Sequence, residues 1–90
     1  MNLNDYVKNN LEDIIDIREI DEVEMNSIPG VRNVPMMGLL MNPDQFMEKG
    51  KTYYIMCLSG GRSGNAVAQL SNQGYDVVNI GGIMSYDPNY

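Results

Sequence analysis

The chain has 90 residues and is acidic, with 12 aspartates and glutamates, 6 lysines and arginines, and a formal net charge of −6. Nucleic-acid binding depends on clustered basic side chains that contact phosphates, and this sequence has no such cluster, so we expect no nucleic-acid partner. A chain of this length predicts one domain, covering 1–90, with a single core of modest size.

The residue types that the chain lacks restrict its chemistry further. It contains no histidine, which excludes a Cys–His dyad, a Ser–His–Asp triad and any histidine-ligated metal site. Its single cysteine cannot form an internal disulfide. We therefore expect neither a metal nor a cofactor. The polar start of the chain has no signal-peptide core, and no apolar run approaches the length of a membrane span, so we expect a cytoplasmic protein without a membrane partner.

Apolar periodicity and turn residues predict a series of short elements. In chain order these are a helix over 4–11, a strand over 14–17, a helix over 20–25, a turn at 27–30, a strand over 31–34, a helix over 42–47, a strand over 52–56, a helix ending at Gly74 and a strand over 76–80. The apolar segment 36–41 shows little periodicity and is left unassigned. The alternation predicts an α/β fold with a short, mainly parallel sheet and helices on both faces.

Two features of the apolar and acidic residues are expected to be structural only. The four methionines at 36, 37, 41 and 47 should mostly fill the core, since a soft-metal site would need tighter, repeated spacing. A few of them near the site could instead be partly exposed to a partner. The acidic residues between 21 and 24 should form a solvated helix face.

Cys57 stands where a buried strand passes into a helix, and this position predicts its chemistry. A loop that enters a helix directs backbone N–H groups inward, and the helix dipole adds positive potential. Gly60 and Gly61 let the backbone curl, Arg62 adds a positive charge, and a thiol in this setting ionises readily. We expect Gly61 to need a positive φ, so that Gly61→Val harms the site more than Arg62→Ala. The alternative interpretation of Cys57 is a buried structural cysteine.

Three blocks of the sequence resemble the rhodanese-like family. The first comprises residues 15–19 and 28–35, similar to the family pattern "D-V-R … H-I-P-G-A … N-I-P". The second is Cys-Leu-Ser-Gly-Gly-Arg-Ser at 57–63, similar to the active-site loop "C-x-x-G-x-R-S". The third runs from 74 to 83 and is similar to "G-F … V-x-x-L-x-G-G-I". The blocks occur in the family's order and spacing.

The resemblance implies a rhodanese-like three-layer fold and a sulfurtransferase. Cys57 would be the catalytic nucleophile, taking sulfane sulfur from thiosulfate, polysulfide or a persulfidated protein as a persulfide. A thiol, a protein acceptor or cyanide would then remove it. The substrate-binding residues would be those of the loop after Cys57: Leu58, Ser59, Gly60, Gly61, Arg62 and Ser63. Ser63 is expected to serve mainly as the helix N-cap.

Two other functions stay open. Cys57 could belong to a persulfide carrier or interaction module loaded by a partner protein, because a net charge of −6 hinders capture of free anions. Phosphatases and arsenate reductases related to this family have Cys-x5-Arg, whereas four residues separate Cys57 from Arg62 here. The shorter spacing disfavours that chemistry. Asp16 and Arg18 could either brace the loop or form a structural ion pair.

Overall fold

The computed structural model describes residues 2–90, which form six short helical segments around a four-stranded sheet, together with one longer helix. In chain order the elements are α1 (Leu3–Asn10), η1 (Leu11–Asp13), β1 (Ile14–Asp16), α2 (Ile20–Met25), β2 (Arg32–Asn33), α3 (Met36–Met41), α4 (Pro43–Phe46), β3 (Thr52–Cys57), α5 (Gly61–Asn72), β4 (Asp76–Gly82) and η2 (Ile83–Ser85). The expected alternation of helices and strands is confirmed.

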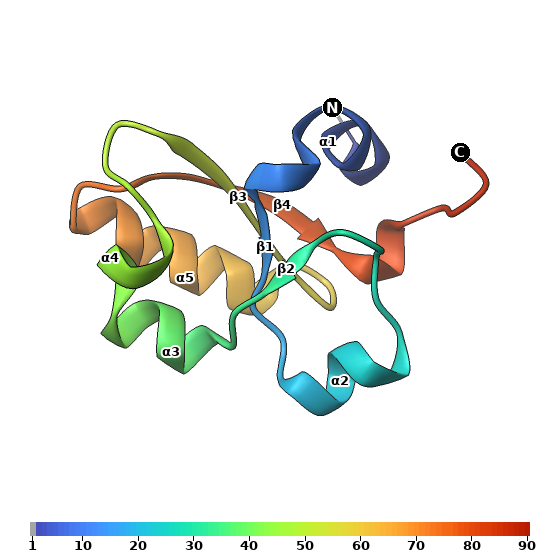
Figure 1. The fold of residues 1–90 in the computed structure, drawn as a ribbon, viewed down its shortest axis with the longest axis horizontal. Coiled ribbons are helices and arrows are strands. Elements are labelled where there is room, and N and C mark those ends of the chain that lie inside the picture. Colours follow the sequence, from blue (N-terminus) through green and yellow to red (C-terminus); the bar gives the residue numbers. More distant parts are fainter. Residues whose placement is uncertain (1) are drawn as a thin grey trace.

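The four strands form a parallel sheet in the order β2-β1-β3-β4. Figure 1 shows β1 and β3 at its centre, with α5 crossing behind them. Because all strands are parallel, their carboxyl ends lie at the same edge of the sheet. Cys57, the last residue of β3, therefore lies at the edge where parallel α/β proteins bind ligands.

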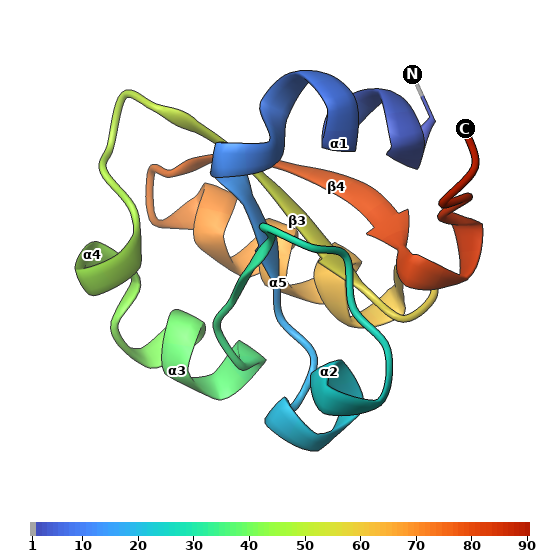
Figure 2. The same ribbon diagram turned by 45° about the vertical axis from the view of Figure 1, so that its right-hand side comes forward.

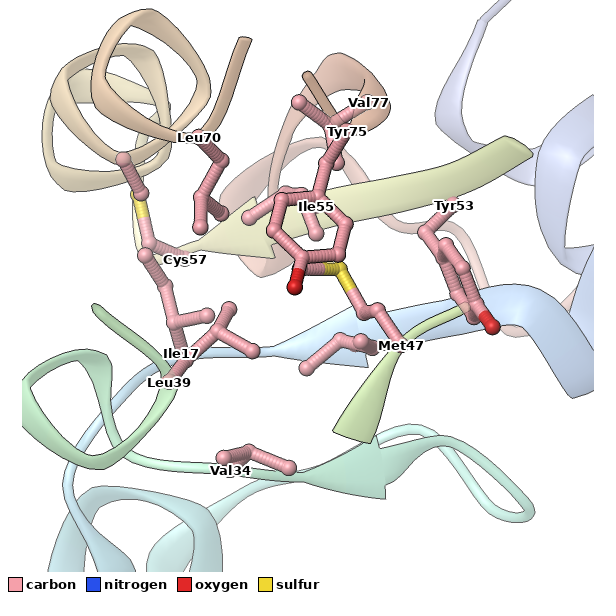
Figure 3. Close-up of a cluster of buried hydrophobic side chains, with 12 residues drawn as sticks. Ile17, Val34, Leu39, Met47, Tyr53, Ile55, Cys57, Leu70, Tyr75 and Val77 are labelled. Atoms are coloured by element: carbon pink, nitrogen blue, oxygen red, sulfur yellow. The ribbon is translucent and has the colours of Figure 1, made fainter. Parts of the chain in front are cut away.

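Side chains of β3 point alternately to the two faces of the sheet, as strand geometry requires. Tyr53, Ile55 and Cys57 belong to one buried cluster, which α3, α4 and α5 cover (Figure 3). Met56 belongs to a second cluster on the opposite face, which α1 and η2 cover. Figure 2 shows α1 on one side of the sheet and α3 and α5 on the other, which confirms the three-layer arrangement.

Helix α3 was not expected, because its residues are almost all apolar and show little helical periodicity. Its buried side is Leu39, which is 0% exposed and packs in the cluster beneath α5. Met37 and Met41 are 67% and 72% exposed, so the expectation that they fill the core is wrong. Met36 and Met47 do pack in or against the core. Only one face of α3 is covered, but the residues on both faces are apolar. The sequence therefore lacks the alternation of apolar and polar residues that would have predicted the helix.

The end of β4 carries an irregularity that shapes the site. Ile55 pairs with Asn79, but Cys57 pairs with Gly82, so β4 contributes one extra residue between these two positions. Gly81, in this bulge, has φ +93°, which favours glycine. A Cβ at Gly82 would overlap the backbone of Leu58, so the chain after Cys57 can pass only because residue 82 has no side chain.

Candidate active site at Cys57

The loop of residues 58–60 carries the chain from β3 to α5 and turns at Gly60. Gly60 has φ +110° and occupies the N-cap position of α5. Gly61 is the first residue of the helix, its φ is not positive, and an added Cβ would meet no atom within 4 Å. The expectation that Gly61 needs a positive φ is therefore wrong. Gly60 is the loop residue that adopts the left-handed conformation, because the backbone reverses there.

The Cys57 sulfur lies inside this turn, with only 1% of the residue exposed. The backbone N–H of Gly60 donates to Sγ at 3.1 Å, and that of Ser63 at 3.5 Å. The Ser63 hydroxyl lies 3.3 Å from Sγ. Burial raises the pKa of the Cys57 thiol, but the hydrogen bonds from Ser63, Gly60 and Ser59 outweigh it. The net pKa lies below its ordinary value, which favours the thiolate.

The remaining residues of the loop differ in their accessibility. Leu58 and Ser59 are exposed, whereas Gly60 is half-buried. The carbonyl of Leu58 accepts a hydrogen bond from the N–H of Met84 at 3.1 Å, which ties the loop to η2. The two exposed residues thus form the outer side of the turn around Cys57.

Arg62 does not point its guanidinium group at an open anion site. Its two terminal nitrogens donate to the two carboxylate oxygens of Glu22, at 2.7 and 2.9 Å. These hydrogen bonds raise the pKa of Arg62 and lower that of Glu22 to about 2. The pair fastens the first turn of α5 to α2. Sequence reasoning missed Glu22, which looked like one more acid on a solvated helix face.

Ser63 was expected as the helix N-cap, and this expectation is wrong. Gly60 holds the N-cap position, and Ser63 lies one turn into α5, fully buried. Its hydroxyl donates to Oδ1 of Asn79 at 2.7 Å. Asn79 also escaped the sequence analysis. A lone amide at an otherwise apolar strand end was the signal that could have revealed it.

Asp16 and Arg18 form a buried ion pair at the end of β1. Both residues are 2% exposed, and Arg18 contacts both carboxylate oxygens of Asp16, at 2.8 to 3.1 Å. Arg18 also donates to the carbonyl of Asn26 at 2.7 Å. The pair thus joins β1 to the residue that follows α2, which favours the structural alternative.

Three further features of residues 2–90 concern a hollow on the surface, metal binding and membrane spanning. A hollow of about 370 Å³ lies at the other end of β3 from Cys57, with Lys51, Tyr53 and Arg32 in its wall. Within the described part of the chain, no cluster of three or more Cys, Asp and Glu could hold a metal ion. The same residues include no helix with the length and apolarity needed to cross a membrane.

The protein is an α/β protein with a parallel sheet, in which backbone amides hold a thiol at a strand–helix junction. The model of the rhodanese-like domain family matches residues 3–87 of the chain. The chain therefore belongs to the rhodanese-like family, as its three sequence blocks predicted.

Relatives and a solved structure agree with this family. The chain is 36% identical over 75 residues to the putative sulfurtransferase YtwF of Bacillus subtilis, covering 82% of this chain and 72% of YtwF. It is 37% identical over 68 residues to the putative sulfur carrier protein YrkF of the same organism, covering 74% of this chain but 36% of YrkF. A rhodanese-like domain protein from Staphylococcus aureus has a TM-score of 0.78 and 33% identity, covering 93% and 82% of the two chains.

Proposed function

We propose that the chain is a sulfurtransferase that carries sulfane sulfur as a persulfide on Cys57. The observation that carries this proposal is the sulfur's position at the start of α5, where Gly60 and Ser63 donate backbone N–H groups to it. Such donors stabilise a negative sulfur more than a neutral one. The relative YtwF, described as a putative sulfurtransferase, supports the same reading.

The proposed reaction has two half-reactions. The Cys57 thiolate attacks the outer sulfur of thiosulfate, the S–S bond of the donor breaks, and sulfite leaves with the electron pair. The product is Cys57–S–S⁻. A thiolate or cyanide acceptor then attacks the terminal sulfur, which returns the Cys57 thiolate and gives a new persulfide or thiocyanate. Kinetics of this type are ping-pong. With polysulfide or a persulfidated protein as the donor, the same attack breaks the donor's terminal S–S bond, and the leaving group is a shorter polysulfide or the protein's thiolate.

The loop residues receive distinct roles in this proposal. The terminal sulfur would accept hydrogen bonds from the amides of residues 58–62. Among these, Gly61 and Arg62 begin α5, and the first N–H groups of a helix have no acceptor within it. Leu58 and Ser59 are exposed and would meet the donor first. Arg62, held by Glu22, would fix the helix start and contribute positive potential.

Intact mass spectrometry tests the persulfide directly. The reduced chain is incubated with polysulfide or thiosulfate, and its mass should rise by one sulfur atom. Dithiothreitol should remove that sulfur, and Cys57→Ser should not gain it. Because Cys57 is the only cysteine, no other thiol in the chain can take up the sulfur. A chain that stays unmodified, or a Cys57→Ser variant that transfers sulfur to cyanide at the native rate, would contradict the proposal.

A second function, persulfide carrier for a partner protein, is favoured by two observations. YrkF is described as a putative sulfur carrier protein, and the net charge of −6 opposes the approach of free thiosulfate. Steady-state assays separate the two functions. A high KM for thiosulfate together with fast transfer from a persulfidated protein indicates a carrier, whereas efficient turnover of small donors indicates the enzyme.

The cytoplasm is the compartment that suits this chemistry. Cys57 must be reduced at the start of each cycle, and cytosolic reductants keep thiols in that state. We therefore include a cytoplasmic location in the proposal. Immunoblotting of fractionated source cells tests it, and recovery of the protein in an extracytoplasmic fraction would contradict it.

A further inference from the structure

Asn79 contacts Gly60, Gly81 and the Ser63 hydroxyl through one carboxamide. Its Oδ1 accepts from the N–H of Gly81 at 3.0 Å and from the hydroxyl of Ser63 at 2.7 Å. Its Nδ2 donates to the carbonyl of Gly60 at 3.1 Å. The amide therefore links the β4 bulge, the N-cap of α5 and the serine beside the sulfur.

These partners fix which end of the amide faces Ser63. A backbone N–H can only donate and a backbone carbonyl can only accept, so Gly81 requires the oxygen and Gly60 requires the nitrogen. A flipped amide would place its NH2 group against the N–H of Gly81 and its oxygen against the carbonyl of Gly60. The Ser63 hydroxyl consequently faces an acceptor, and its hydrogen points to Asn79.

The single hydroxyl hydrogen of Ser63 has three acceptors within reach, of which the carbonyl oxygen of Gly81, at 3.4 Å, is the most distant. Oδ1 of Asn79 lies 2.7 Å from the hydroxyl oxygen, and Sγ of Cys57 lies 3.3 Å from it. While Cys57 is a thiol, its S–H can donate to the Ser63 oxygen and the hydroxyl can donate to Asn79, so every group is satisfied. When the thiol loses its proton to a solvent base, the sulfur becomes the stronger acceptor.

We propose that Asn79 is a positioning residue that holds the Ser63 hydroxyl hydrogen away from the Cys57 sulfur in the thiol state and releases it to the thiolate. Asn79 thus opposes ionisation of the resting thiol and keeps the Gly60 turn in place through Nδ2. Its importance for sulfur transfer rests on the proposed function, whereas its effect on the thiol does not.

The charged groups around Cys57 come from three neighbouring elements. They are Asp16 and Arg18 at the end of β1, Glu22 on α2 and Arg62 on α5, and they form the two ion pairs described above. Helix α3 and the part of β4 beyond Asp76 carry no charged residue. Substitution of Asn79 by an uncharged residue leaves all four groups in place, so a change in the Cys57 pKa then reports the hydrogen bonds.

The test measures the Cys57 pKa from the ultraviolet absorbance of the thiolate, with the Cys57→Ser spectrum subtracted. Asn79 is exposed, so leucine, of similar size, should be tolerated there and should keep water from replacing the lost acceptor. Asn79→Leu should lower the pKa by about 0.5 to 1 unit, the scale of one neutral hydrogen bond. In a Ser63→Ala background the same substitution should not lower it.

Two matched variants separate this role from a merely structural one. Asn79→Asp keeps an acceptor for Ser63 but loses the donor to Gly60, as Asn79→Leu does, and its added charge should raise the Cys57 pKa. A loosened loop would instead move both variants in the same direction. The proposal is overturned if Asn79→Leu does not lower the pKa, if it lowers it equally without the Ser63 hydroxyl, or if Asn79→Asp lowers it too. Asn79→Ala replaces Asn79→Leu should circular dichroism show the latter unfolded.

The measurement uses the reduced chain without any sulfur donor. A failure to form the persulfide would therefore remove the proposed function and leave the Asn79 result intact. Conversely, normal persulfide formation with an unchanged pKa in Asn79→Leu would remove only the positioning role.

Discussion

Arg62 and Glu22 join two terminal guanidinium nitrogens to two carboxylate oxygens at 2.7 and 2.9 Å, although the residues lie 40 positions apart in the chain. Bidentate pairs of this kind fix orientation as well as distance. Both side chains remain partly exposed, so water screens their attraction. The contact therefore contributes to the site mainly by holding the start of α5, with its free N–H groups, against α2.

The Glu22 pair predicts an acid-dependent loss of stability. The pKa of Glu22 is lowered to about 2 in the folded chain from 4.5, so between these values the unfolded chain binds more protons. The stabilisation is present above pH 4.5 and is lost as the pH falls toward 2. In urea unfolding, Glu22→Gln should be less stable than the native chain at about pH 6, and the gap should shrink at about pH 3. An unchanged gap would exclude this contribution.

Arg62→Ala should slow persulfide formation by roughly ten- to a hundredfold, because it breaks the charged hydrogen bonds to Glu22 that hold the start of α5. It removes positive potential beside Cys57 and leaves the Glu22 carboxylate without its partner. Stopped-flow measurement of sulfur loading gives the rate. The double variant Arg62→Ala/Glu22→Gln serves as the control and should recover part of the loss, because the unpaired negative charge is gone. If the double variant shows no recovery, the unpaired charge of Glu22 does not contribute to the loss of rate.

Gly82→Ala should damage the site from the neighbouring strand. The new Cβ overlaps the backbone of Leu58, so either the loop or β4 must move. Overpacking of this type costs about 1–3 kcal/mol, and for a domain of this size each kcal/mol lowers the Tm by roughly 4–8 °C. The Tm, measured by differential scanning fluorimetry, and the rate of sulfur loading should both decrease.

Gly61→Ala is the matched control for that substitution. It adds the same methyl group at the start of α5, where no atom beyond its chain neighbours and its own helix backbone lies within 4 Å. Replacing a helical glycine by alanine stabilises by up to about 1 kcal/mol. We expect an unchanged or higher Tm and native sulfur loading. A Tm loss at Gly61 as large as at Gly82 would contradict the steric explanation.

Ser63→Ala should raise the pKa of Cys57. The thiolate loses the hydroxyl donor and keeps the backbone donors, while its burial, which raises the pKa, stays the same. The fraction of thiolate at neutral pH should fall, and the rate of alkylation by iodoacetamide should fall with it. The pH profile of alkylation provides the measurement. A shift to lower pKa would show that the hydroxyl does not donate to the sulfur.

Asp16→Ala should be the most destabilising of these substitutions. It leaves the buried Arg18 guanidinium without its carboxylate, and breaking a buried ion pair in this way costs about 3–5 kcal/mol. Asp16→Ala/Arg18→Met removes both charges and should be considerably more stable than the single variant. Chemical denaturation of the two proteins tests this, and equal stabilities would argue against the unpaired charge as the cause.

Local patterns in the sequence were enough to predict several elements of this protein. A continuous run of aromatic and β-branched residues predicted β3, the glycine-containing loop after Cys57 predicted the strand–helix junction, and the three blocks predicted the family. These features follow from the steric preferences and periodicity of residues that are close in the chain. The same local patterns assigned the positive φ to Gly61, whereas the structure has it at Gly60. Two adjacent glycines give no indication of which one adopts the left-handed conformation.

Contacts between residues far apart in the chain hold the site in place. Glu22 faces Arg62, Asn79 accepts a hydrogen bond from Ser63, and Gly82 makes room for Leu58, and each pair is separated by 16 to 40 residues. The exposure of Met37 and Met41 likewise depends on which face of α3 meets the sheet. Such contacts depend on the packing of whole elements against one another, and a single sequence contains no local pattern that specifies it.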